Sequence, residues 1–204
     1  MIPMELTEKF HPSLVKKNQS GQDYVSIDGY INRLNTVLGH KWAWGVNSWK
    51  LKTDVPTTSS GKPQYLAIVQ GTLTVVLDDI GVISIGEDDD SFLTTQRGII
   101  SRDGIGAGIN FDPDTAVKTA QAEALKKACH QFGIALYLWD EEERDFVALQ
   151  RKAMKSDAGL KELVVTVLER NGQDATKENM LSFFDIKDVT PANLRGALEG
   201  MGLL

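Results

Sequence analysis

Apolar residues near the start of the chain recur at the spacing of one helix face. Ile27, Ile31, Leu34 and Leu38 follow each other at intervals of three or four residues. Asp28 is a candidate N-cap, and Gly39 is a candidate for the left-handed residue that follows a helix. The pattern predicts an amphipathic helix in this segment.

The following segment has the alternation of β-strands. Trp42, Trp44, Val46, Trp49 and Leu51 predict a half-buried strand with one break in phase near Asn47. Residues 64–79 and 80–87 are two β-rich runs, and the acidic pair Asp78–Asp79 between them predicts a hairpin. The stretch from residue 88 to 110 is polar and glycine-rich. The tryptophans and Tyr24 are expected in the core, although exposed aromatic side chains can also stack on bases.

A second helix starts after Asp112, an expected N-cap followed by Pro113 in the first turn. The apolar positions on one side are Val117, Ala120, Ala124, Ala128 and Phe132, and the repeated alanines would let the helix lie close against a sheet. The opposite side carries Glu123, Lys126, Lys127 and His130. Cations at a helix C-terminus are stabilised by the helix dipole, so they form either a solvated face or a row aimed at phosphates.

The composition changes after about Glu141. Residues 141–155 are charged and have a helical pattern, and residues 156–159 suggest a linker. Three short helical patterns follow. Thr176 and Thr190 are expected N-caps, and Pro191 is expected in the first turn of the last helix. We expect a larger core domain in residues 1–155 and a small all-helical domain in residues 156–204. The predicted class is α+β: an N-terminal helix, an antiparallel β-meander on a long Ala-rich helix, and a helical C-terminal unit.

Composition narrows the function classes. The chain has 204 residues, a net charge of −6 and one cysteine, which excludes an internal disulfide. It has neither the apolar run of a membrane helix nor the h-region of a signal peptide, so a cytoplasmic location is expected. The acidic total weighs mildly against nucleic-acid binding, but the acids are clustered and leave room for a local basic patch.

The sequence contains no convincing catalytic constellation. The three histidines lack metal-ligand spacing, and Cys129 has the pattern of a small core residue. Glu87–Asp90 is a weak metal candidate. The glycines of residues 102–110 resemble a phosphate-cradling loop without the required spacing. A flexible turn or a hairpin is therefore expected there, with Arg102 available to a polyanion. We therefore predict a protein that is not an enzyme and needs no cofactor or metal.

Two segments resemble a known family. The run from Ala116 to Asp140, AVKTAQAEALKKACHQFGIALYLWD, is similar to the signature helix of the Rad fifty-two/twenty-two family of single-strand annealing proteins, near its DNA damage response protein A branch. The shared elements are an Ala-rich helix with ALKKA, then FG and an apolar tail. The segment YVSIDGYINRLNTVLGHKWAWGV resembles the family's opening helix and first strand. The similarity covers roughly residues 10–145, and it implies that residues 1–155 form the annealing core.

This resemblance implies a ring of subunits with an outer basic groove that holds single-stranded DNA, bases outward. It implies groove contacts from Lys126 and Lys127. His130 stands where the family has a stronger cation, and Lys16 or Lys17 matches a cation ahead of the opening helix. We expect ATP-independent annealing of complementary strands in recombination or repair, in a bacterial cell or a phage-infected host.

Two other functions stay open at this point. The core could protect single strands or DNA ends while the C-terminal helices recruit a recombinase or a single-strand-binding protein. A metal-dependent nuclease that uses Glu87–Asp90 is the remote alternative.

Overall fold

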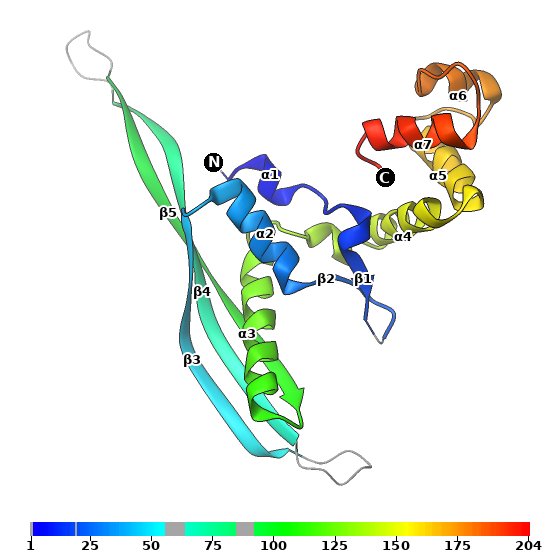
Figure 1. Cartoon of the computed structure of the whole chain (residues 1–204). Coiled ribbons are helices and arrows are strands. Elements are labelled where there is room, and N and C mark those ends of the chain that lie inside the picture. The colour runs from blue at the N-terminus through cyan, green and yellow to red at the C-terminus, as the bar shows by residue number, and fades with distance from the viewer. Residues whose placement is uncertain (1, 19, 56–63, 85–91) are drawn as a thin grey trace. The chain divides into compact units, whose positions relative to one another are not determined.

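The computed structural model describes residues 2–18, 20–55, 64–84 and 92–204. The described part contains helices and two antiparallel sheets, so the predicted α+β class is confirmed (Figure 1). The chain divides into two compact units: unit 1 comprises Met1–Glu8 and Ile27–Ala135, and unit 2 comprises Lys9–Ser26 and Leu136–Leu204. This division differs from the boundary expected after residue 155, because the helix before that point packs with the C-terminal helices.

The main sheet of unit 1 has the order β3-β4-β5, with β3 at Trp42–Val55, β4 at Gln64–Ser84 and β5 at Phe92–Asn110. The hairpin predicted at Asp78–Asp79 is wrong, since β4 continues through both residues. The register between β4 and β5 shifts at Asp78 and Asp79: Leu77 pairs with Gly98, and the next pair is Ile80 with Gln96. The break in phase predicted near Asn47 is confirmed by a register shift between Val46 and Ser48.

The glycine-rich residues 102–110 lie in β5, which pairs antiparallel with the preceding strand β4, so they fit the hairpin alternative and do not form the flexible turn. Gly104, Gly106 and Gly108 of β5 face α3, the helix Pro113–His130. A β-carbon on each would lie 1.9 Å from Ala124 O, 2.1 Å from Ala120 O and 2.3 Å from Ala116 O, respectively. Backbone therefore packs directly on backbone along this seam. The alternate spacing of the glycines places all three on one face of the strand, and the alanines match them at helical spacing. Figure 1 shows α3 lying along the main sheet.

The N-terminal helices of unit 1 are α1, Met4–Thr7, and α2, Ile27–Leu38. Tyr30, Leu34 and Leu38 of α2 are buried, and α2 packs against α3. Gly39 has φ +59°, which confirms it as the left-handed residue after the helix. The N-cap prediction for Asp28 is wrong, because the helix already begins at Ile27.

The aromatic residues of β3 are less buried than expected. Trp42 and Trp44 are half-buried, and the indole N–H of Trp42 donates to Asn35 Oδ1 at 3.0 Å. Trp49 is 61% exposed, so its assignment to the core is wrong. The reason is that α3 packs mainly on β4 and β5 and hardly reaches β3. Tyr24, in unit 2, is also only half-buried.

Unit 2 begins with a 3-10 turn, η1 (Pro12–Leu14), and the short antiparallel pair β1 (Val15–Lys17) and β2 (Asp23–Val25). After η2 (Leu136–Trp139) its helices are α4 (Glu141–Lys155), α5 (Asp157–Arg170), α6 (Lys177–Phe183) and α7 (Pro191–Gly200). The caps predicted at Thr176 and Thr190 are confirmed, as is Pro191 in the first turn of α7. The predicted linker shrinks to Ser156, which caps α5 through Gly159 N.

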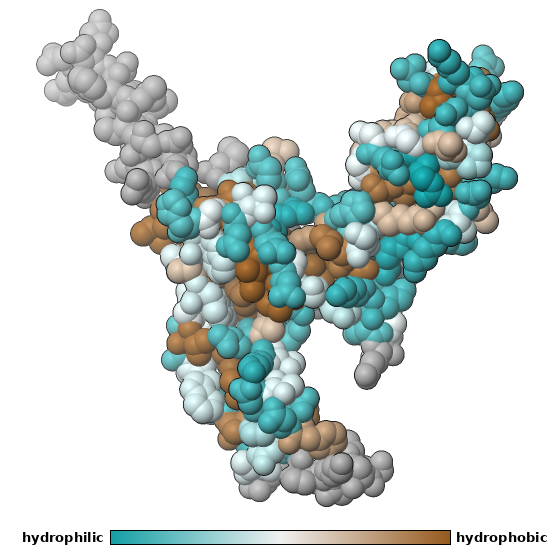
Figure 2. Space-filling view, in the orientation of Figure 1, coloured by the Kyte–Doolittle hydropathy of each residue, from teal (hydrophilic) through white to brown (hydrophobic). Residues whose placement is uncertain are grey.

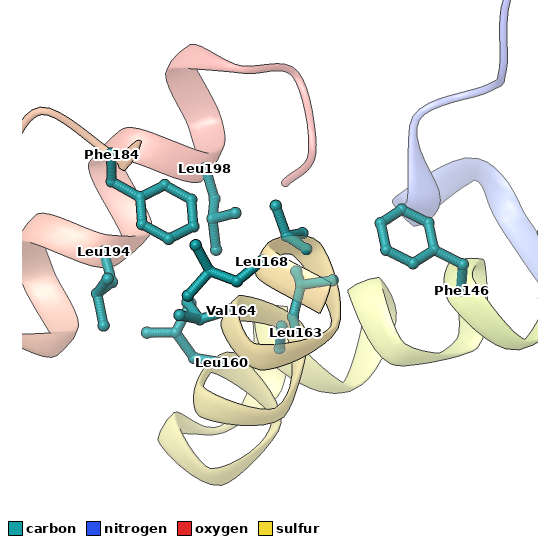
Figure 3. Packing of buried hydrophobic residues seen from close by; sticks show 10 residues of the cluster. Phe146, Leu160, Leu163, Val164, Leu168, Phe184, Leu194 and Leu198 are labelled. Carbon is teal, nitrogen blue, oxygen red and sulfur yellow. The ribbon is translucent and has the colours of Figure 1, made fainter. Parts of the chain in front are cut away.

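The core of unit 2 is a cluster of apolar side chains from α4, α5 and α7 and from the residue after α6. Phe146 from α4 and Leu160, Leu163, Val164 and Leu168 from α5 belong to it, together with Phe184, Leu194 and Leu198 (Figure 3). Because α4 contributes to this cluster, it belongs structurally with the C-terminal helices.

Candidate nucleic-acid interface

The structure separates the predicted DNA contacts between the two units. Lys126, Lys127 and His130 lie on the last turns of α3, and Arg102 lies on β5, all in unit 1. Lys16 and Lys17 lie on β1 of unit 2 and are exposed. The unit 1 residues form the candidate site described below.

Lys126 is already engaged within the fold. Its ammonium lies 2.8 Å from Glu123 Oε1, and its side chain is only 15% exposed. Glu123 and Lys126 are three residues apart, so they meet on one face of the helix. This carboxylate offsets much of the charge that Lys126 could offer to a phosphate.

Lys127 has the opposite character. Its side chain is exposed, and within the described ranges no carboxylate forms an ion pair with it. Consecutive residues of an α-helix point about 100° apart, so Lys127 leaves the helix on a different side from Lys126. One turn later, the amide of Gln131 donates to the backbone oxygen of Asp103 in β5. Lys127 therefore lies on the side of α3 that follows β5.

Arg102 lies near the same end of this seam. Its guanidinium is exposed, lies 5.7 Å from the centre of the Phe132 ring and donates to the backbone oxygen of Ser101 at 3.0 Å. None of the ion pairs among the described residues involves it. Lys127, Gln131 and Arg102 together are called the α3–β5 flank from here on; it carries two exposed cations on a rigid helix–strand seam.

His130 is held inside the fold. Its Nε2 lies 2.9 Å from the hydroxyl of Tyr30 in α2, and the two rings are 5.8 Å apart. Burial lowers its pKa, Glu123 opposes this shift, and Lys126 and Lys127 add to it. A neutral, half-buried imidazole bonded to α2 is a poor phosphate ligand, so the geometry favours an anchoring role for His130 over the predicted DNA contact.

Other candidate chemistry is sparse in the described residues. Cys129 is buried as expected, and burial raises the pKa of its thiol to about 12. No group of three or more metal-binding side chains occurs in the part of the chain that the structure describes. Glu87–Asp90, the weak metal candidate, lies outside that part. Among the described helices, none has the length and apolar character to cross a membrane.

Comparison with known proteins adds no assignment. No protein-family model matches the chain, and no curated protein is significantly similar to it. The candidate interface therefore depends on the geometry of the α3–β5 flank and on the resemblance of the α3 sequence.

The sequence pattern does not distinguish Lys126 from Lys127, whereas the fold does. The signal for the difference was present as Glu123, three residues before Lys126 and four before Lys127. Spacing alone allows either lysine to pair with that carboxylate. The position of β5 beside Lys127 and of α2 beside His130 depends on tertiary packing and has no local signal.

Proposed function

We propose that this protein binds single-stranded DNA and promotes annealing of complementary strands, without ATP, as an oligomeric ring active in recombination or repair. The observation that carries the proposal is the α3–β5 flank, where Lys127 and Arg102 are exposed and have no carboxylate partner among the described residues. The resemblance of α3 to the annealing-protein signature helix supports the same reading.

Annealing makes physical demands that such a flank meets. Two DNA strands repel each other through their phosphates, and cations fixed on a rigid scaffold lower that repulsion while leaving the bases free to pair. The chain carries a net charge of −6, so a single copy offers little attraction to DNA at long range. Repetition of the flank in a ring would concentrate cations along one path, and carboxylates more than about 10 Å away would be screened by salt.

The proposal assigns different tasks to the predicted residues. Lys127 and Arg102 contact phosphates. Lys126, paired with Glu123, contributes less, and His130 keeps α2 and α3 together through Tyr30. Lys16 and Lys17 stay predicted contacts from the other unit. Lys17 is partly engaged, with its ammonium 3.6 Å from Asp23 Oδ1 and 3.2 Å from the backbone oxygen of Gly21.

The test is a strand-annealing assay with two complementary labelled oligonucleotides and no nucleotide cofactor. We expect the unaltered protein to accelerate annealing and the Lys127→Ala/Arg102→Ala variant to lose most of the effect while keeping its melting temperature. A folded double variant that binds and anneals as well as the parent would refute the site. Failure of the parent to bind single strands would refute the function itself.

The two alternatives remain predictions with separate readouts. If the C-terminal helices recruit a partner, a variant with an altered surface on α6 or α7 should anneal DNA as well as the parent. The same variant should no longer capture a purified recombinase or single-strand-binding protein. Nuclease activity would appear as shortened labelled DNA after long incubation with Mg²⁺ or Mn²⁺.

A further inference from the structure

Apolar side chains reach the surface along the strands of the main sheet (Figure 2), and some of them lie on the face opposite α3. Among the described helices, α3 is the one that packs extensively against this sheet. It lies on the face of Gly104, Gly106 and Gly108. Successive residues of a strand point to opposite faces, so the odd-numbered neighbours of these glycines point away from α3. This second face is called the open face from here on.

The middle of the open face is polar. Asn47 of β3 donates to the hydroxyl of Thr72 in β4 at 2.7 Å, and that hydroxyl donates to Asp103 of β5. The hydroxyls of Thr74 and Ser101 lie 3.0 Å apart in the next row. Polar side chains that bond to one another across the strands are what a solvated face of an antiparallel sheet requires.

The part of the open face towards Asn110 is apolar instead. Leu66 and Ile68 of β4 are half-buried there, and Ile105 and Ile109 of β5 are 54% and 55% exposed. All four alternate with buried residues that face α3. Leu66 pairs directly with Ile109, and the other two lie within diagonal reach across the strands. Leu66, Ile68, Ile105 and Ile109 form the apolar patch. A contiguous exposed patch of this kind marks an interaction surface.

The β3 side of the apolar patch carries two cations. Register places Lys50 beside Ile68 and Lys52 beside Leu66, so both lysines share the open face with the patch. Both are exposed. None of the ion pairs among the side chains that the structure describes involves either lysine. The patch is therefore edged by positive charge on one side, which favours an occupant with carboxylates at that edge.

The packing of α3 shows how a helix fits this sheet. Its contacts advance by two residues along β5, from Gly104 through Gly106 to Gly108, and by four residues along the helix, from Ala124 to Ala116. Two strand residues span about 7 Å, and four helix residues span about 6 Å. The two repeats match, so a helix that lies along the strands stays in phase with them.

A helix along the open face would meet the same repeats. Lys50 and Lys52 are also two strand residues apart, so carboxylates at positions i and i+4 of a helix can reach both. β3 and β5 flank β4 and lie about 10 Å apart, about the width of one helix. Ile105 and Ile109 are about 13 Å apart along the strand, the length of two to three helical turns. The open face therefore has room for one short helix.

We propose that the open face binds an amphipathic helix of a partner protein, with its apolar stripe on the patch and two acidic residues, one turn apart, at Lys50 and Lys52. Burial of the stripe supplies affinity, and the paired charges supply orientation. Single-stranded DNA fits this surface less well, because its bases stack on aromatic rings, whereas the patch is aliphatic. Arg102 lies beside Phe132 on the α3 side, so this inference goes beyond the proposed function and does not rest on it.

The first experiment measures binding of a labelled helical peptide to the full chain by fluorescence anisotropy. The probe has about 18 residues, enough to form a helix, with leucines along one face and two glutamates one turn apart beside them. The control peptide has lysines in place of the two glutamates. We expect the control to bind at least roughly tenfold more weakly. Equal affinity for the two peptides, or no binding of the glutamate peptide at submillimolar concentration, would overturn the proposal.

The second experiment places the peptide on the patch. Ile105→Glu/Ile109→Glu should lose binding, because the contact would bury unpaired carboxylates. Ile99→Glu is the matched control: Ile99 lies in the same strand and on the same face, beyond the polar rows, and is 70% exposed. It should bind as the parent does. Each variant must keep the parent's melting temperature. Equal losses from the isoleucine variants would overturn the placement.

A charge reversal tests the edge of the patch. Lys50→Glu/Lys52→Glu should bind the lysine peptide better than the glutamate peptide, the opposite of the parent's preference. Both lysines are exposed, so the change should leave folding intact. A folded variant with the parent's preference would overturn the role of the two lysines.

Other occupants of the patch have their own readouts. If light scattering shows an oligomer that Ile105→Glu/Ile109→Glu reduces to one chain, a second copy covers the patch and the proposal is wrong. If the same folded variant loses single-strand binding, the patch is a nucleic-acid site and the proposal is again wrong. A parent that binds the glutamate peptide but no DNA would support the open face and refute the proposed function; the reverse result would refute the open face alone.

Discussion

Gly106 of β5 lies against the backbone of Ala120 in α3: a β-carbon at Gly106 would come within 2.1 Å of the carbonyl oxygen of Ala120 and 2.3 Å of Ala124 N. The contact is between two backbones, with no flexible side chain that could yield. It sets how close α3 lies to the sheet, and therefore where Lys127 projects relative to β5.

Substitution of Gly106 by alanine should force α3 away from the sheet. Overpacking of a dense interior costs about 1–3 kcal/mol, and for a chain of this size each kcal/mol lowers the melting temperature by about 2–4 °C. Thermal unfolding measures the effect. Gly45→Ala is the matched control, because it is also a strand glycine and a β-carbon there would meet nothing within 4 Å. Equal melting temperatures for the two variants would contradict the close packing.

Lys127 and Lys126 should differ in their effect on DNA binding. Lys127→Ala should weaken single-strand binding by roughly tenfold, equivalent to about 1.4 kcal/mol. The dependence of log affinity on log salt should become shallower by about 0.7 for each phosphate that is no longer neutralised. Lys126→Ala should have a smaller effect, because Glu123 already engages that ammonium. Fluorescence anisotropy at several salt concentrations separates the two variants.

The control for the lysine series is Lys118→Ala, an exposed α3 position whose ammonium lies 2.6 Å from Asp114. It removes the same charge from the same helix at a distance from the α3–β5 flank. If Lys118→Ala weakens binding as much as Lys127→Ala, the protein attracts DNA only through its general charge, and the assignment of the flank is wrong.

Stability should depend on pH through His130. Burial lowers its pKa in the folded chain, so the unfolded chain binds the proton more readily, and stability rises with pH across this range. The contribution is fully present above the ordinary histidine pKa of about 6.5 and is lost as the pH falls through the lower folded value. The melting temperature of the parent should therefore drop between about pH 7.5 and about pH 5 more than that of His130→Gln. The comparison variant is His40→Gln at an exposed histidine.

The Tyr30–His130 contact should stabilise the packing of α2 on α3. Tyr30→Phe removes the hydroxyl that lies 2.9 Å from Nε2 and should cost about 1 kcal/mol, a typical net value for one hydrogen bond. Chemical denaturation measures this change. If His130 anchors the fold, Tyr30→Phe should bind single strands at neutral pH nearly as well as the parent. If the imidazole touches DNA, the binding of Tyr30→Phe and of His130→Gln should fall together.

Cys129 should report on opening of unit 1. Its thiol is buried, and burial raises its pKa to about 12, so the reactive thiolate is scarce at neutral pH. A thiol reagent should label the folded protein more than roughly a hundredfold more slowly than the denatured chain. Rapid labelling without denaturant would show that α3 leaves the sheet easily.

The sequence by itself determined features that depend on near neighbours along the chain. Asp112 and Pro113 start α3 as predicted, Gly39 follows α2 in the left-handed conformation, and Thr176 and Thr190 cap the last two helices. These signals act over one helical turn, where side chain and backbone are adjacent whatever the rest of the chain does. The break near Asn47 is equally local, since it interrupts the alternation of the strand itself.

Tertiary structure decided everything that depends on which surfaces meet. Glycines that fitted a flexible turn or a hairpin lie in the strand that receives α3, because their missing side chains suit a backbone contact with Ala116, Ala120 and Ala124. Trp49 is exposed because α3 covers β4 and β5 instead of β3. Of the two neighbouring lysines, Lys126 pairs with Glu123, whereas Lys127 is exposed beside β5. Local patterns define the helix that carries these cations, but burial and charge partners arise from segments far apart in the chain, and no local signal encodes them.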